Sequence, residues 1–390
     1  MSRCPRIAML IESSRSYGRE LERGIAAYVR EHGPWTVFQH ERRLYDAVPA
    51  WLKHWDGDGI IARIGSARIA EEIRKKRMPT VDLLGLHAVP GVPAVMTDHE
   101  AVARAAAEHL MERGLKHFAY CGQSSVFFSE RRHEFFSECL RDRGYPAPHV
   151  YVDPARRKAD ESYAEVQSLP SAESMASWIA SLPKPVGLMA CNDLRAQQVL
   201  TVCGQYGFAV PDEVAVIGVD NDDVLCELCD PPLSSVAKNA RRVGFEAAAM
   251  LARMLKGVRP PRKRTLIVPL GVVSRRSTDV LAVDDADLAA ALRFIRDHAC
   301  DGIDIDDVIG HVHVSRSTLK RRFSQLLRRS PSEEIRRVRV VRVKELLTTT
   351  PHPLAKVAAI AGFDHVESMC KLFKKATGRT PGEFRAEWRA

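Results

Sequence analysis

A signal for the start of a helix occurs twice near the carboxyl end of this chain, and this repeat limits that region to a duplicated helical module. The two copies, Ser330–Glu333 and Thr380–Glu383, lie fifty residues apart, and the residues before them align as well, with Phe323 matching Phe373. In each copy the hydroxyl can cap a helix, proline suits the first helical position, and glutamate can complete a capping box. A new helix is therefore expected to begin at each copy.

Upstream of each helix start lies a pattern of a short apolar helix, a break and a second helix. In the first copy the apolar stretch is 305–312, and Ser315 is placed to cap the helix after the break. In the second copy the stretch is 354–361, Gly362 marks the turn, and Asp364 is expected to cap the next helix. Two helices joined by a short turn form a helix-turn-helix, whose second helix enters the DNA major groove.

The charge of this segment favours DNA as its partner. Residues 315–390 contain 18 Lys and Arg against 7 Asp and Glu, a net charge of +11, while the rest of the chain carries −2. A face that binds phosphate groups needs such an excess of positive charge. A sugar-binding protein or enzyme with a protein-interaction tail is the alternative, and steep loss of heparin binding with salt would distinguish DNA binding from it.

The second copy resembles the signature of the AraC/XylS family of bacterial transcription regulators. The resemblance rests on Ala361-Gly362-Phe363, Phe373-Lys374-Lys375 and Thr380-Pro381 at their relative spacing, although Ser368 and Met369 replace the usual aromatic residues. Burial of Leu319, Phe323, Met369 and Phe373 would turn the opposite helix faces toward DNA. The residues expected on those faces are Arg316, Ser317, Lys320, Arg321, Arg322, His365, Glu367, Cys370, Lys371, Lys374 and Lys375.

The first 270 residues alternate β-branched runs with amphipathic helices, which predicts parallel sheets covered by helices on both faces. Two series of such units indicate an α/β domain of two lobes with a cleft between them. The expected strands are Ile7–Ile11, Thr36–Gln39, Gly59–Ile64, Thr80–Leu84, Ala94–Thr97, Phe118–Cys121, Val186–Ala190 and Val214–Val219. The predicted domains are a sensor over 1–277, a linker over 278–287 and an all-α DNA-binding domain over 288–390.

Three stretches of the sensor resemble the sugar-sensing domain of LacI/GalR regulators and type I periplasmic binding proteins. They are Met189–Asp193, Val216–Asn221, and Pro232–Val236 with the helix that follows. The first two place polar side chains at strand ends, where ligands bind in open α/β sheets. The residues expected to bind the ligand, with Arg132 carried over from the resemblance, are Asp220, Arg132, Asp193, Asn192, Asn221, Asp98, Tyr17 and Arg63.

The joining of this sensor to an AraC-type module resembles a family of xylose-responsive regulators. The resemblance implies a sugar effector such as D-xylose, a homodimer, promoter DNA as target and recruitment of RNA polymerase. Arg63 lies where that family leads us to expect an acidic residue, so a different sugar or a sugar acid is the alternative effector. Sugar binding is expected to close the lobes and reorient the DNA-binding modules.

Other functions find little support in the sequence. There is no arrangement of nucleophile, acid and base and no Gly-rich phosphate loop, so we expect neither an enzyme nor a bound cofactor. Cys226-x-x-Cys229 stands alone and predicts no metal site. Nine cysteines, an odd number, suit a reducing cytoplasm. The first apolar run is too short for a signal peptide or a membrane span.

Overall fold

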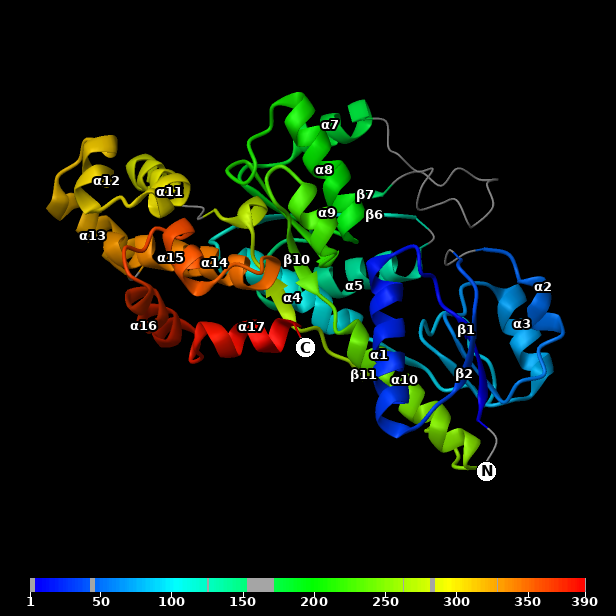
Figure 1. Ribbon diagram of the computed structural model, residues 1–390. Helices are drawn as coiled ribbons and strands as arrows, with labels where there is room; N and C mark the ends of the chain where they lie inside the picture. The colour runs from blue at the N-terminus through cyan, green and yellow to red at the C-terminus, as the bar shows by residue number, and fades with distance from the viewer. Residues whose placement is uncertain are drawn as a thin grey trace.

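Two α/β lobes and a separate helical domain make up the structure (Figure 1). The computed structural model describes residues 4–42, 46–124, 126–152, 172–261, 263–280, 285–327 and 329–389. This architecture confirms the predicted fold class, in which parallel sheets are followed by an all-helical unit.

The first lobe is built on a parallel sheet of order β2-β1-β3-β4. Its strands are β1 (Arg6–Leu10), β2 (Thr36–Gln39), β3 (Gly59–Ala62) and β4 (Thr80–Asp82), and its helices are α1 (Ser16–His32), α2 (Ala50–Lys53) and α3 (Ala67–Lys76). Because side chains alternate along a strand, Ile7 and Met9 pack toward α1, while Ala8 and Leu10 pack toward α2 and α3. The sheet is thus buried on both faces, as its near-continuous apolar strands predict.

The second lobe contains a six-stranded sheet of order β12-β10-β9-β8-β6-β7, in which only the β10–β12 pair is antiparallel. Its strands are β6 (His117–Gly122), β7 (His149–Val152), β8 (Val186–Ala190), β9 (Val214–Asp220), β10 (Ser234–Ala237) and β12 (Gly271–Val273). One face is covered by α4 (His99–Met111) and α5 (Phe127–Asp142), and the other by α7 (Ala172–Ser181) and α8 (Asp193–Tyr206). A short helix, α9 (Asp223–Leu228), follows β9.

The chain passes between the lobes three times. It leaves the first lobe between β5 (Val95–Thr97) and α4, and returns between β10 and α10 (Ala240–Leu255), which packs along α1. The third passage joins β11 (Thr265–Ile267), which pairs with β5, to β12 in the second lobe. Three neighbouring connections form a hinge, and the space between the lobes lies beside it.

The helical domain holds two cores that share one long helix. Its helices are α11 (Ala286–His298), α12 (Ile305–Val312), α13 (Arg316–Leu327), α14 (Pro331–Thr349), α15 (Leu354–Ile360), α16 (Val366–Thr377) and α17 (Pro381–Arg389). α14 contributes Ile335 and Val338 to the first core, and Val340, Val343 and Leu347 to the second. Val341, between these two sets, is only half-buried, because the helix turns different faces to its two cores.

Most of the predicted helix starts are confirmed. Ser330 and Thr380 each form the expected capping box with the glutamate three residues later, and Ser315 accepts a hydrogen bond from the Thr318 amide. The predicted cap at Asp364 is wrong: α16 begins after His365, whose side chain makes no capping bond. Gly362 adopts a φ of 74°, and a Cβ there would lie 2.7 Å from the Cys300 carbonyl oxygen, so this turn needs glycine.

All eight predicted strands are present, with ends that differ by at most two residues. The short strands β7, β11 and β12 were not expected from the sequence. At the predicted linker, Thr278 is buried in the second lobe and Asp285 caps α11, while residues 281–284 lie outside the described residues. Across the described ranges, no helix is long and apolar enough to cross a membrane.

Candidate ligand cleft and nucleic-acid interface

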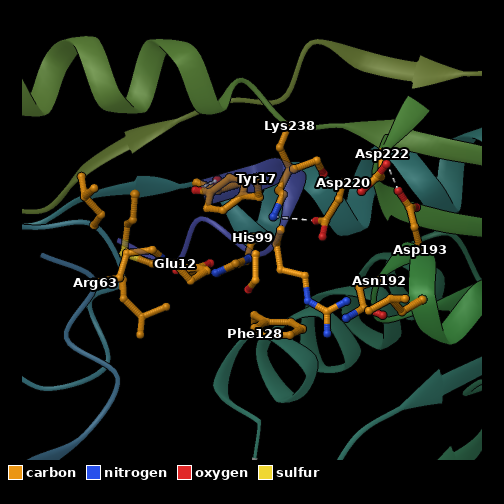
Figure 2. A pocket seen from close by; sticks show the side chains of 18 of the residues that line it. Glu12, Tyr17, Arg63, His99, Phe128, Asn192, Asp193, Asp220, Asp222 and Lys238 are labelled. Carbon is orange, nitrogen blue, oxygen red and sulfur yellow. Dashed lines mark hydrogen bonds and ion pairs between the residues drawn. The ribbon is translucent and has the colours of Figure 1, made fainter. Parts of the chain in front are cut away.

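A cavity of about 280 Å³ lies between the two lobes, beside the hinge. Both lobes line it, the first with groups that follow β1 and β3, the second with groups that follow β8 and β9 (Figure 2). Six of the eight residues predicted to bind the ligand line this cavity: Tyr17, Arg63, Arg132, Asn192, Asp193 and Asp220. The carboxyl ends of parallel strands therefore meet here, as in other open α/β sheets.

Two predicted residues do not line the cavity. The Asp98 carboxylate accepts a hydrogen bond of 3.0 Å from the Ala101 amide and caps α4. The Asn221 amide oxygen accepts a hydrogen bond of 2.9 Å from Arg275, and the Asn221 backbone amide donates to Ser235. Both side chains hold the framework around the cavity and leave ligand contacts to their neighbours.

The lining residues that the sequence-based prediction did not include are more numerous, and among them are Glu12, His99, Phe128 and Lys238. Glu12 follows β1 by two residues, and Lys238 follows β10 directly, so the strand-end rule that identified Asp220 could have found both. His99 begins α4 at the hinge, and Phe128 is the second residue of α5. Only the packing of α5 against the second sheet brings Phe128 to the cavity wall.

The wall of the first lobe is formed by a buried ion pair beside an aromatic ring. Arg63 pairs with Glu12, and their side chains are only 8% and 4% exposed. They lie side by side because β1 and β3 are adjacent in register, with Leu10 opposite Ala62. The Arg63 guanidinium lies 5.1 Å from the centre of the Tyr17 ring, and the Tyr17 hydroxyl shares a 2.9 Å hydrogen bond with Thr97. Burial raises the pKa of Tyr17 to about 12, so its hydroxyl stays protonated at neutral pH.

Lys238 reaches the cavity from the hinge and touches both lobes. Its ammonium group lies 2.5 Å from an Asp220 carboxylate oxygen and 3.5 Å from the centre of the Tyr17 ring. Burial lowers the pKa of Lys238 to about 8, although the Asp220 charge opposes that shift. Asp220 adopts a φ of 127°, which is rare for a residue other than glycine, and such strained backbone is often found at functional sites.

The wall of the second lobe presents a buried arginine. Arg132 is 1% exposed, donates to the Cys191 carbonyl oxygen and lies 4.0 Å from Asp220, with its guanidinium 5.0 Å from the centre of the Phe128 ring. Asn192 both lines the cavity and caps α8, since its side chain accepts a 2.9 Å hydrogen bond from the Arg195 amide.

Asp193 is buried in a small hydrogen-bond network at the same wall. Its carboxylate accepts from the Ser235 hydroxyl at 2.6 Å and from the Asp222 amide at 2.8 Å. Burial, and then the charge of Asp220, raise the pKa of Asp193 well above its usual range. The Cys226 thiol donates to the same carboxylate at 3.6 Å, and burial raises the pKa of this thiol. Cys226 thus serves as a buried hydrogen-bond donor, and within the described ranges no group of three His, Cys, Asp or Glu side chains could hold a metal ion.

The cavity offers buried polar atoms that the described residues leave without a hydrogen-bond partner: Glu12 Oε2, His99 Nδ1 and Arg132 Nε. Burial, followed by the charges of Arg132 and Lys238, lowers the pKa of His99 well below its usual value, so its ring is neutral. A neutral imidazole, a carboxylate and a guanidinium together can accept from and donate to hydroxyl groups. Since buried polar groups are costly when unpaired, the cavity suits a small ligand with several hydroxyl groups.

The second helix of each helix-turn-helix, α13 or α16, exposes the side chains predicted to contact DNA. Both helices lie at the edge of the helical domain away from the sensor lobes (Figure 1). Leu319 and Phe323 on α13, and Met369 and Phe373 on α16, are buried as expected. The exposed members of the predicted set are Arg316, Ser317, Lys320, Arg321, His365, Glu367, Lys371, Lys374 and Lys375.

Two of the predicted DNA contacts are partly buried. Arg322 pairs with Asp285 and Asp287 at 2.7 Å each, which ties α13 to the start of α11 and occupies the group expected to bind phosphate. Cys370 is half-buried and packs against the second core. Arg316, although exposed, pairs with Asp306 of the preceding helix. Five other cations of the predicted set are exposed: Lys320, Arg321, Lys371, Lys374 and Lys375.

Three known protein families match successive parts of the chain. Residues 6–100 match the XylR N-terminal domain, residues 107–278 match a periplasmic binding protein-like domain, and residues 309–387 match a helix-turn-helix domain.

Full-length relatives share this arrangement. The chain is 30% identical to the xylose operon regulatory protein of Escherichia coli (strain K12), over 97% of this chain and 96% of the relative. It is 29% identical to the protein of the same name from Haemophilus influenzae (strain ATCC 51907 / DSM 11121 / KW20 / Rd), over 97% and 98%. The solved structure of the xylose-binding transcription activator XylR is 29% identical and superimposes with a TM-score of 0.69 over 99% of both chains.

Proposed function

Because this chain belongs to the family of the xylose operon regulatory proteins, and is therefore a sugar-sensing transcription regulator that binds DNA, we propose that its effector is a neutral sugar of pentose size. D-Xylose is the first candidate, since relatives are named for xylose. We further propose that the protein is an activator that works without catalysing a reaction, in the cytoplasm where its DNA target lies.

One observation carries the choice of a neutral sugar. Buried polar groups from both lobes face one cavity, and three of the four cationic side chains that line it lie within 4.0 Å of a carboxylate, Arg63 of Glu12, and Lys238 and Arg132 of Asp220. A neutral sugar can satisfy such groups through its hydroxyls without leaving a buried charge unpaired. The cavity of about 280 Å³ lies near the low end of the usual range for small-molecule sites, which favours a monosaccharide.

The proposed mechanism couples this cavity to the DNA-binding face. A ligand that bridges Arg132 of the second lobe and the Glu12–Arg63 pair of the first binds the closed cleft better than an open one, and so shifts the lobes toward closure. Two such chains would place four groove-binding helices on repeated half-sites near a promoter, where they would help to recruit RNA polymerase.

The test is a thermal-shift and calorimetric screen of pentoses, hexoses and sugar acids, because a ligand that binds the folded state raises its melting temperature. D-Xylose or a close relative should bind, and Arg132→Lys should weaken its binding about tenfold or more, since lysine cannot form the planar fork. The matched control is Arg131→Lys on the same helix, because the Arg131 side chain is 40% exposed and pairs with Glu134. Lack of binding by every neutral monosaccharide would refute the proposal.

A further inference from the structure

The buried Glu12–Arg63 pair lines the cavity from the first lobe, and its two residues follow neighbouring strands of that lobe's sheet (Figure 2). The backbone fixes both residues: the Arg63 amide donates a 2.9 Å hydrogen bond to the Leu10 carbonyl, and α1 packs closely on Glu12 at Gly18. A Cβ at Gly18 would lie 1.6 Å from the Glu12 carbonyl oxygen, so only glycine permits this approach. The pair therefore sits at a rigid part of the wall.

From this placement we propose that the Glu12–Arg63 pair determines effector selectivity by holding the buried part of the first-lobe wall electrically neutral, so that the cleft accepts a neutral sugar and rejects a sugar acid. The inference rests on the proposed function and specifies the ligand class of the same site. The charge of Arg63 alone would favour a ligand with a carboxylate. Because Glu12 already occupies the position beside Arg63 that such a carboxylate would need, the pair disfavours an acidic ligand.

The physical basis is the cost of an uncompensated charge in a buried site. Glu12 Oε2 is buried and has no hydrogen-bond partner among the described residues, so it is available to accept from a ligand hydroxyl. A ligand carboxylate in that place would lie next to the Glu12 carboxylate and would leave one of the two negative charges without a cation. A hydroxyl avoids that cost and satisfies the orphaned oxygen.

The pair differs from the other charged contact of the cavity, between Lys238 and Asp220. Lys238 comes from the hinge and Asp220 from the second lobe, so movement of the lobes can separate those groups. Glu12 and Arg63 follow neighbouring strands of one sheet and move together. Their charge balance thus persists in every position of the lobes, as a selectivity filter requires.

Charge-changing variants test this role. Glu12→Gln keeps the size of the side chain but leaves Arg63 without its carboxylate, so neutral-sugar affinity should fall about tenfold and affinity for a uronate should rise about tenfold. The double variant Glu12→Gln with Arg63→Gln restores a neutral wall, and its preference should return toward the neutral sugar. Binding is measured by calorimetry with D-xylose, D-glucuronate and D-galacturonate.

Glu20→Gln is the matched control, because it breaks pairs with Arg23 and Arg241 outside the cavity and should leave the preference unchanged. Melting temperatures without ligand verify that each variant is folded. If the wild-type protein binds D-xylose and folded Glu12→Gln keeps the wild-type ratio of neutral to acidic affinities, this inference is overturned while the proposed function survives. If the wild-type protein binds only uronates, both fail.

Discussion

Lys238 is a buried ammonium group at the hinge, and its environment predicts how stability changes with pH. Burial lowers its pKa from the ordinary 10.5 to about 8 in the folded protein. Between these two pH values the unfolded chain keeps a proton that the folded chain has released. The unfolded state therefore binds more protons, and the contribution of Lys238 to the free energy of unfolding rises as pH increases through 8.

The expected result is a pH-dependent difference between the wild-type protein and Lys238→Met. From pH 7 to pH 9 the wild type should gain about 1 kcal/mol of unfolding free energy relative to the variant. Urea unfolding without ligand at both pH values measures this difference. Lys256→Met, at an exposed position after the same helix α10, should follow the wild type at both pH values. The prediction would be contradicted if the difference in unfolding free energy between the wild type and Lys238→Met were the same at pH 7 and pH 9.

Individual cavity residues could be predicted where the strand-end rule sufficed. Asp220 and Asp193 follow apolar strands in the sequence, and parallel strands end at a common edge, so both lie at the cavity. The rule failed for Asp98 and Asn221, because a short polar side chain at a strand end can equally cap the next helix or bind a neighbouring side chain. It also gave no sign that Arg63 would be neutralised by Glu12, since that pairing depends on the order of strands in the sheet.

At the scale of elements, α14 determines how the two helix-turn-helix motifs are held together. Its amino-terminal half packs in the first core and its carboxyl-terminal half in the second. The sequence predicted the helix and its start, because the capping box is a local signal. It did not predict the burial of Val340 and Val343, because a helix that serves two cores has no single apolar face, and 3.6-residue periodicity assumes one.

We expect Leu347→Ala to destabilise the helical domain by about 2 to 5 kcal/mol, because Leu347 is fully buried in the second core. Loss of that core should weaken DNA binding through α16 as well as lower the melting temperature. Differential scanning calorimetry of the full chain, together with a DNA titration, measures both effects. Arg336→Ala, at an exposed position of the same helix, should change stability by less than about 0.5 kcal/mol. Similar losses for the two variants would show that α14 does not hold the cores together.

The exposed cations of the two second helices should divide into two kinds of DNA contact. Arg321 on α13 is exposed opposite buried Leu319 and Phe323, where it can form a bidentate contact with guanine. Arg321→Ala should therefore weaken binding to the specific site by about 1 to 3 kcal/mol and reduce the discrimination among bases at one position. Lys374→Ala should weaken specific and random DNA alike and reduce the slope of log affinity against log salt by about 1. If Arg321→Ala lowered the affinity for specific and random DNA equally, Arg321 would be a phosphate contact instead.

At the scale of the whole molecule, α4 connects the cavity to the helical domain. His99, its first residue, lines the cavity, and at its far end His109 and Arg113 hydrogen-bond to Thr278. The next residue, Asp279, contacts the DNA-binding domain: its carbonyl oxygen accepts from Arg296 of α11 at 3.1 Å. Packed elements and buried hydrogen bonds of this kind can carry coupling between distant sites, provided that two arrangements exist.

Arg296 is the main ion-pair contact between α11 and the sensor. Its guanidinium makes two contacts with the Asp212 carboxylate, of 2.9 and 3.3 Å, and is 12% exposed. Arg337 of α14 reinforces this contact through Asp279 at 3.4 Å. Both arginines lie on helices that pack in the first core of the helical domain, so movement of the second lobe would be passed directly to α11 and α14.

Arg296→Met should therefore separate sensing from DNA binding without removing either. Sugar affinity in the absence of DNA should stay within about twofold of wild type, while the factor by which sugar changes DNA affinity should fall at least about fivefold, toward one. DNA titrations with and without sugar measure this factor, and by linkage sugar titrations with and without DNA must give the same value. The control is Arg293→Met, because Arg293 is an exposed residue on the same helix. In this variant, sugar should change DNA affinity by the same factor as in the wild type. If Arg296→Met kept it too, the signal would have to reach the DNA-binding face by another route than the α4, Thr278 and α11 contacts.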